Sequence, residues 1–166
     1  MKLRDSGMPE EAYWETLLDV DLILDRLGVN ASFRDVVELG CGYGTFTLPM
    51  ARRISGVLDT LDIEPAMVDR TRQRASAAGL RNVAGHLRDV MKDGFGCEPK
   101  SKDACLLFNI LHGEEPLRLL SEAARVTRSG GFVYAIHWRF DPQTPPRPQH
   151  GHPAPAGADC GVGGTN

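Results

Sequence analysis

A glycine-rich segment, Glu38-Leu39-Gly40-Cys41-Gly42-Tyr43-Gly44, follows a short apolar stretch and precedes a helical pattern. Glycine permits a tight turn and lets a ligand approach the backbone closely. The amino end of the following helix is directed at the same crevice. The dinucleotide fingerprint G-x-G-x-x-G needs a sixth-position glycine, which is Thr45 here, and no P-loop lysine is present. The turn therefore favours a phosphate-free, zwitterionic ligand over a pyrophosphate.

Four polar side chains are expected at the same place as this turn. Glu38 precedes it, where a carboxylate repels a pyrophosphate and attracts an ammonium group. Asp62 comes eighteen residues after Gly44, at the end of the next apolar stretch, where an acid can accept hydrogen bonds from vicinal ribose hydroxyls. Asp89 and Asn109 follow later stretches. Because ligands bind at the carboxyl edge of open parallel sheets, we expect all four groups to converge there.

Strands that alternate with helices are needed to position these groups. Strand patterns occur at residues 35–39, 57–63, 83–87, 104–110 and 132–138. Helical patterns occur at residues 9–27, 46–54, 65–78 and 114–128, with Thr45 placed to cap the second, and residues 92–102 read as a loop. Such alternation predicts an α/β domain with a parallel sheet and right-handed crossovers.

The order and spacing of these segments resemble the class I S-adenosylmethionine-dependent methyltransferases over roughly residues 35–138. The glycine turn looks like the family's first motif, and Leu61-Asp62-Ile63-Glu64-Pro65-Ala66-Met67 looks like its second. Arg88-Asp89-Val90 resembles the adenine-side segment, and Asn109-Ile110-Leu111-His112 the end of the fourth strand. The resemblance implies a Rossmann-like three-layer sandwich with a mostly parallel sheet of about five strands.

The resemblance also implies S-adenosylmethionine as cofactor and direct displacement at its sulfonium methyl. The implied cofactor-binding residues are Glu38, Gly40, Gly42 and Gly44 for the methionine moiety, Asp62 for the ribose, Asp89 and Val90 for the adenine, and Asn109 for the methionine part or the acceptor; Ile63, next to Asp62, is a further cofactor-binding residue. Such catalysis depends on alignment and a dry pocket more than on a strong acid or base. No catalytic residue is assigned; His112 and Tyr43 are the candidates, and with Tyr13 and Trp14 they are also candidates for lining the acceptor side.

The composition bears on the class of methyl acceptor and on the cellular location. The net charge of -3 and the pI of about 5.9 argue against a nucleic-acid partner, so a small-molecule acceptor is expected. The Asn/Asp-Pro-Pro-aromatic pattern of amino-group methylases is absent after the fourth strand. The chain has no membrane-length apolar stretch, no secretory segment and no paired cysteine spacing, so a cytoplasmic protein without a metal site is predicted. Arg70, Arg72 and Arg74 read as solvated charges.

The sequence departs from the family after the fifth predicted strand. Residues 140–166 hold six of the 11 prolines and no apolar periodicity, so we expect a domain at 1–139 and a disordered tail that binds no metal through His150, His152 or Cys160. The family's last two strands would be missing, as in a truncated or frame-shifted form, and the unpaired fifth strand would allow a homodimer. Two alternatives remain open: a non-catalytic cofactor-binding or dimerisation module, and a nicotinamide-dependent oxidoreductase, which the glycine spacing disfavours.

Overall fold

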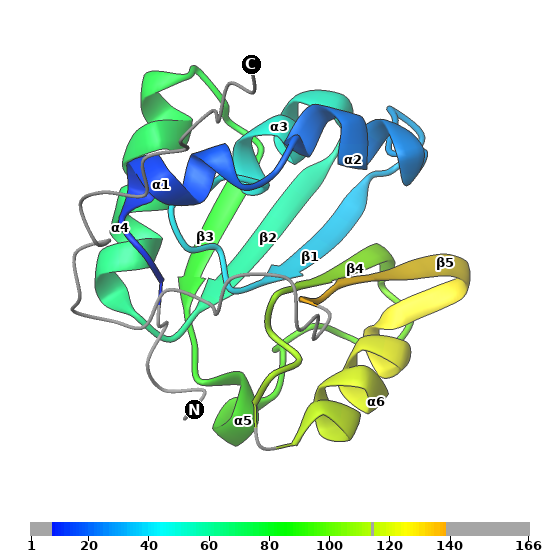
Figure 1. Cartoon of the computed structure of the whole chain (residues 1–166). Coiled ribbons are helices and arrows are strands. Elements are labelled where there is room, and N and C mark those ends of the chain that lie inside the picture. The colour runs from blue at the N-terminus through cyan, green and yellow to red at the C-terminus, as the bar shows by residue number, and fades with distance from the viewer. Residues whose placement is uncertain (1–7, 114, 139–166) are drawn as a thin grey trace, which may run out of the picture.

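The computed structural model describes residues 8–113 and 115–138, which form a parallel sheet with helices on both faces (Figure 1). The strands are β1 (Asp35–Leu39), β2 (Val57–Asp62), β3 (Val83–Leu87), β4 (Lys102–Phe108) and β5 (Thr127–Ile136). Their order is β3-β2-β1-β4-β5, and every neighbouring pair is parallel. From β1 the chain adds β2 and β3 towards one edge of the sheet, and it then adds β4 and β5 towards the other edge. The strand order therefore switches between β1 and β4, and open α/β sheets bind ligands at such a switch point.

The helices complete the three layers of the Rossmann-like fold. They are α1 (Glu11–Thr16), α2 (Val20–Arg26), α3 (Thr47–Arg53), α4 (Pro65–Ala77), α5 (Val90–Asp93) and α6 (Pro116–Val126). Figure 1 shows α1 to α4 on one side of the sheet and α5 and α6 on the other. Neighbouring strand residues point to opposite faces, so Val36 packs in the core beneath α2 and α3, whereas Val37 packs in the core beneath α6. All seven residues of β4 are buried, as in a central strand.

Two predicted helix features are wrong, and one short helix was not predicted. The single helix expected at residues 9–27 is two helices, because the Asp19 carboxylate accepts the N–H of Leu22 and starts α2 as its cap. The loop expected at 92–102 gives way at its start to α5, which Asp89 caps through the N–H groups of Met91 and Lys92. Thr45 does not cap α3, which begins at Thr47 without a side-chain cap.

The fifth strand also begins earlier than predicted. Helix α6 ends at Val126, and β5 starts at Thr127, so Ser129, Gly130 and Gly131 lie within the strand rather than ending the helix. A register shift between Lys102 and Ala104 accommodates this irregular start. Within the described residues β5 is an edge strand, and its Phe132 side chain is 50% exposed.

Several expectations fall on parts of the chain beyond these ranges. The disordered tail, the absent last two strands and the residues His150, His152 and Cys160 all lie outside the described residues. Within residues 8–113 and 115–138, no helix is both long enough and apolar enough to span a bilayer.

Candidate functional site

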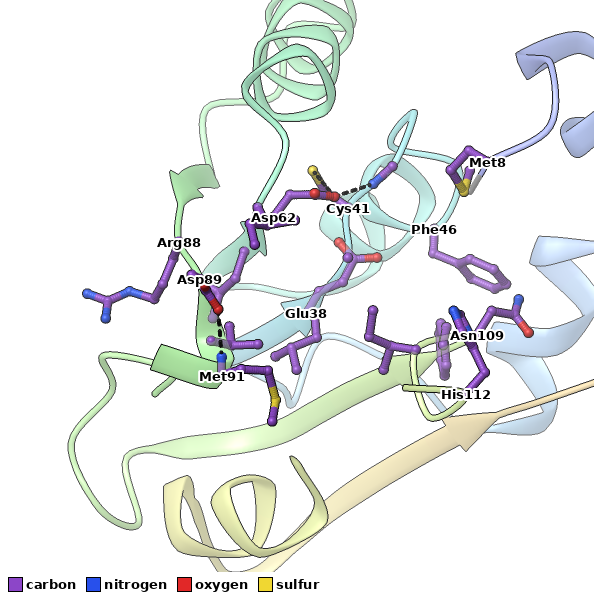
Figure 2. Close-up of a pocket in the computed structure, with 18 of the residues that line it drawn as sticks. Met8, Glu38, Cys41, Phe46, Asp62, Arg88, Asp89, Met91, Asn109 and His112 are labelled. Atoms are coloured by element: carbon purple, nitrogen blue, oxygen red, sulfur yellow. Dashed lines mark hydrogen bonds between the residues drawn. The ribbon is translucent and has the colours of Figure 1, made fainter. Parts of the chain in front are cut away.

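A cavity of about 580 Å³ lies at the carboxyl ends of β1, β2 and β4 (Figure 2). The glycine turn after β1, the segment after β3 and the N-terminal residues Met8 and Trp14 complete its walls. Eight of the nine residues implied as cofactor-binding line it, namely Glu38, Gly40, Gly42, Asp62, Ile63, Asp89, Val90 and Asn109. The fold therefore brings together side chains that lie up to 71 residues apart in the sequence.

The glycine turn is fixed directly against Asp62. The Gly42 N–H donates to Asp62 Oδ2 over 3.1 Å, and the Glu64 N–H donates to Oδ1 over 3.0 Å. Gly40 and Gly42 have φ values of 73° and 50°, a region that glycine enters without strain. Burial raises the pKa of the Asp62 carboxyl, while the two backbone N–H groups lower it. A carboxylate has about four lone-pair positions, so this oriented group can still accept hydrogen bonds from a ligand.

Glu38 is a buried carboxyl at the centre of the cavity wall. Its side chain is only 2% exposed, and its Oε2 accepts hydrogen bonds from Thr47 Oγ1 over 2.6 Å and Thr60 Oγ1 over 2.9 Å. These bonds tie β1 to α3 and β2 beneath the turn. Burial raises the pKa of this carboxyl from 4.5 to about 7, although the two hydroxyl donors lower it. A cation bound beside it would favour the ionised form.

The two ends of the cavity differ in chemistry. Figure 2 shows Asp62, Asp89 and Arg88 on one side of Glu38, and Phe46, Asn109 and His112 on the other. Asp89 is held by its capping bonds to α5, so its position is fixed by the helix it starts. The rings of Phe46 and Phe108 lie 4.6 Å apart between centroids. One end is thus acidic and polar, and the other is largely aromatic.

Two uncharged polar side chains at this site are unsatisfied. Asn109 has a φ of 55°, and both of its amide atoms are buried without a hydrogen-bond partner among the described residues. Thr45 also lines the cavity, and its buried hydroxyl likewise has no hydrogen-bond partner among the described residues. A buried polar group without a partner costs about 1–3 kcal/mol, so these atoms mark places where a ligand can donate or accept. Thr45 was missed as a cavity residue because its place after the turn suggested a helix cap.

Of three further residues that the sequence suggested for the site, His112 lines the cavity, whereas Tyr43 and Gly44 do not. His112 lines the cavity and stacks on His137, with 6.2 Å between ring centroids. Tyr43 is not among the lining residues; its hydroxyl donates to the Pro9 carbonyl over 2.9 Å, and burial raises its pKa. Gly44 also lies outside this cavity. Its φ is 82°, and a Cβ there would meet Leu48 Cδ1 at 2.7 Å, so the backbone conformation and the packing together account for this glycine.

Aromatic and cysteine candidates near the turn are placed as follows. Trp14 is 6% exposed and lines the cavity, whereas Tyr13 is exposed and does not. Cys41 is buried, and its thiol lies 3.6 Å from Asp62 Oδ2. Burial and the neighbouring carboxylate raise the pKa of this thiol far above its ordinary range. Because the thiolate is the reactive form, Cys41 fills space beside the turn and is a poor nucleophile.

The three arginines of α4 that were predicted to be solvated charges are all at least partly exposed, but two of them also form ion pairs that were not predicted. Arg70 and Arg74 are four residues apart and share a helix face, and both form ion pairs with Glu11 of α1. Arg72 points elsewhere: it is half exposed, contacts Asp69 and donates to the Gly85 carbonyl. The pattern could not reveal the partner, because Glu11 lies 59 residues before Arg70.

Comparisons with known proteins agree with this geometry. A family model described as a methyltransferase domain matches residues 36–131, more than half of the chain. A Mycolicibacterium smegmatis protein named as a probable S-adenosylmethionine-dependent methyltransferase is 32% identical over 130 residues, which are 75% of this chain and 45% of that protein.

Two shorter matches have different named acceptors. The 23S rRNA (uracil(1939)-C(5))-methyltransferase RlmD of Alkalilimnicola ehrlichii is 48% identical over 71 residues, 43% of this chain and 16% of that protein. Aklanonic acid methyltransferase DauC of Streptomyces sp. is 34% identical over 62 residues, 36% of this chain and 28% of that protein. The chain spans less than half the length of these curated relatives.

Solved structures show the same fold. A SAM-dependent methyltransferase from Aquifex aeolicus superposes with a TM-score of 0.69 at 21% identity, over 82% of this chain and 73% of that one. The N-terminal domain of EvdMO1 with SAH bound gives a TM-score of 0.62 at 23% identity, over 76% of this chain and 52% of that one. Since the matched family segment contains the glycine turn, Asp62 and Asn109, the chain belongs to the class I S-adenosylmethionine-dependent methyltransferases.

Proposed function

We propose that this chain binds S-adenosylmethionine in the cavity at the ends of β1, β2 and β4 and transfers its methyl group to a small-molecule acceptor. The observation that carries the proposal is the hydrogen bond from the Gly42 N–H to Asp62, beside the buried Glu38 carboxyl. An acid held against a glycine turn suits an adenosyl ligand without phosphates, because carboxylates repel a pyrophosphate and attract cations.

The residues present fit the cofactor. Asp62 would accept from the ribose hydroxyls, with Ile63 beside it, and Asp89 and Val90 would face the adenine. Glu38, Gly40 and Gly42 would hold the methionine end, where the ammonium group meets the buried carboxyl. The unsatisfied amide of Asn109 and hydroxyl of Thr45 supply further neutral donors and acceptors in the same cavity.

For methyl displacement, the protein mainly has to position the two reactants and exclude water. When bound, the cofactor supplies a methyl group activated by a sulfonium. Trp14, Phe46 and Phe108 are buried walls of the cavity, so they exclude water from that end. Aromatic rings also attract a nearby cation. The imidazole of His112 could take a proton from the molecule that receives the methyl group, although the displacement needs no strong base.

A small molecule is the acceptor that the observations favour. The chain is acidic overall, which argues against a nucleic-acid acceptor. The similarity to an aklanonic acid methyltransferase points the same way. An RNA acceptor is the second candidate, because the match to RlmD reaches 48% identity, although over only 71 residues.

A transfer assay separates these functions. The chain is incubated with methyl-labelled S-adenosylmethionine and either a low-molecular-weight metabolite extract or purified ribosomal RNA, with the Asp62→Asn variant as control. Label in the small-molecule fraction that is lost in the variant supports the proposal. Label in RNA supports the second candidate. Cofactor binding without transfer to either pool supports the non-catalytic module.

A further inference from the structure

Residues 8–16, called here the N-terminal cover, lie over the cofactor cavity. Met8 and Trp14 line the cavity from this segment, and Figure 2 shows Met8 on the same side of the cavity as Phe46. Helix α1 within the cover has six residues, and Trp14 is its one buried side chain. Such a short element with little apolar burial has low local stability and can open independently of the sheet.

Side-chain contacts to α4 and to the glycine turn hold the cover. Arg74 Nη1 lies 2.7 Å from Glu15 Oε1 and 3.0 Å from Glu11 Oε1, and Arg70 Nη2 lies 3.0 Å from Glu11 Oε1. The Tyr43 hydroxyl adds its bond to the Pro9 carbonyl. All of the ion-paired side chains are partly exposed, so salt and substitution can weaken these contacts.

The cover and the glycine turn share one guanidinium group. Arg74 Nη1 also donates to the Tyr43 carbonyl over 2.9 Å, and Thr71 Oγ1 donates to the Gly42 carbonyl over 3.0 Å. The same arginine thus contacts the turn on one side and two carboxylates of the cover on the other. Movement of the cover changes the surroundings of the turn that the cofactor contacts.

Met8 shows why the cover has to move. A Cβ at residue 42 would lie 3.0 Å from Met8 Cε, so this methyl group packs on the face that glycine leaves open. A ligand that approaches the turn closely at that face needs the same space. A cofactor seated against this face would displace Met8, and with it the segment that Glu11 and Glu15 anchor.

We infer that the N-terminal cover is a gate for the cofactor, and that it opens when Glu11 and Glu15 separate from Arg70 and Arg74. This inference rests on the proposed cofactor binding. Its consequence is kinetic: the ion pairs limit how often the cavity is open, so they limit both entry and release of the cofactor.

Stopped-flow mixing with S-adenosylhomocysteine tests the gate. Trp14 and Trp138 are the two tryptophans of the chain, so Trp14 fluorescence in a Trp138→Phe background reports on the cover. The double variant Glu11→Gln/Glu15→Gln should raise the association and dissociation rates together, by about three- to tenfold for the loss of several partly exposed ion pairs. Added salt should accelerate exchange in the parent and have less effect in the double variant.

Matched controls keep the outcomes distinct. Arg72→Gln removes a charge from the same helix without touching the cover, and should leave both rates unchanged. Tyr43→Phe removes the bond to Pro9 and should accelerate exchange on its own. Parent-like rates in the double variant and in Tyr43→Phe would overturn the gate while leaving cofactor binding intact. Absence of S-adenosylhomocysteine binding by the parent would overturn the proposed function, and the gate with it.

Discussion

Replacing Glu38 by glutamine should remove a pH dependence from both stability and cofactor binding. Burial raises the pKa of this carboxyl from 4.5 to about 7, so the folded protein holds a proton there that the unfolded chain releases at lower pH. The stability linked to that proton is fully present below about pH 4.5 and is lost as the pH rises through about 7. Glutamine keeps an oxygen acceptor for Thr47 and Thr60 and cannot ionise.

The size of the effect follows from the shift. The rise in the pKa of Glu38 from 4.5 to about 7 corresponds, as an order of magnitude, to roughly 3 kcal/mol between the protonated and ionised forms. Urea unfolding from pH 5 to 8 should therefore show the parent losing up to about 3 kcal/mol relative to Glu38→Gln. The difference should develop chiefly between pH 5 and 7.5.

Cofactor binding should show the opposite trend. If the ionised Glu38 carboxylate meets the ammonium group, affinity for S-adenosylhomocysteine rises with pH through about 7 in the parent and stays flat and weaker in Glu38→Gln. Asp59→Asn is the control, since that carboxylate lies outside the cavity and its pKa is lowered. Parallel pH profiles for the parent and Glu38→Gln, in unfolding and in binding, would refute the reasoning.

Three further substitutions test other parts of the site. Asp62→Ala should weaken S-adenosylhomocysteine binding in calorimetry by about 1–3 kcal/mol, because hydrogen-bonding groups lose their partner; unchanged affinity removes Asp62 from the site. Asn109→Gly should leave the free protein about as stable in thermal unfolding, since it removes unsatisfied buried atoms and glycine adopts the φ of 55° found there, yet reduce the stabilisation by ligand; a strongly destabilised free protein contradicts this. Gly44→Ala should lower the free energy of unfolding in urea by about 1–3 kcal/mol, because alanine is strained at the φ of 82° found there and its Cβ also meets Leu48; a neutral result contradicts this strain.

The strands and the turn could be predicted because their signals are local. Val36 and Val37 alternate into two cores, and β4 is a continuous apolar run, so their residue types identify them. The convergence of Glu38, Gly42 and Asp62 followed from the rule that parallel strands present their carboxyl ends at one edge. These inferences needed no knowledge of which distant side chains touch.

What the sequence could not show depends on distant contacts or on competing local roles. The ion pairs of Arg70 and Arg74 join residues about sixty positions apart, and nothing in their spacing names Glu11. Asp19 could lie within one continuous helix or cap a second one, and in the structure it caps α2. Thr45 illustrates the reverse case, in which a residue suited to capping instead lines the cavity, with its hydroxyl oxygen buried.

Calorimetric titration of the parent chain with S-adenosylhomocysteine, and separately with NAD, tests the central claim most directly. The glycine turn clasped to Asp62 predicts saturable binding of the first with one site per chain, and no heat from the second. Binding of NAD instead of S-adenosylhomocysteine would contradict the assignment of this cavity. So would the absence of binding heat with either ligand in a sample that has the circular dichroism of a folded α/β protein.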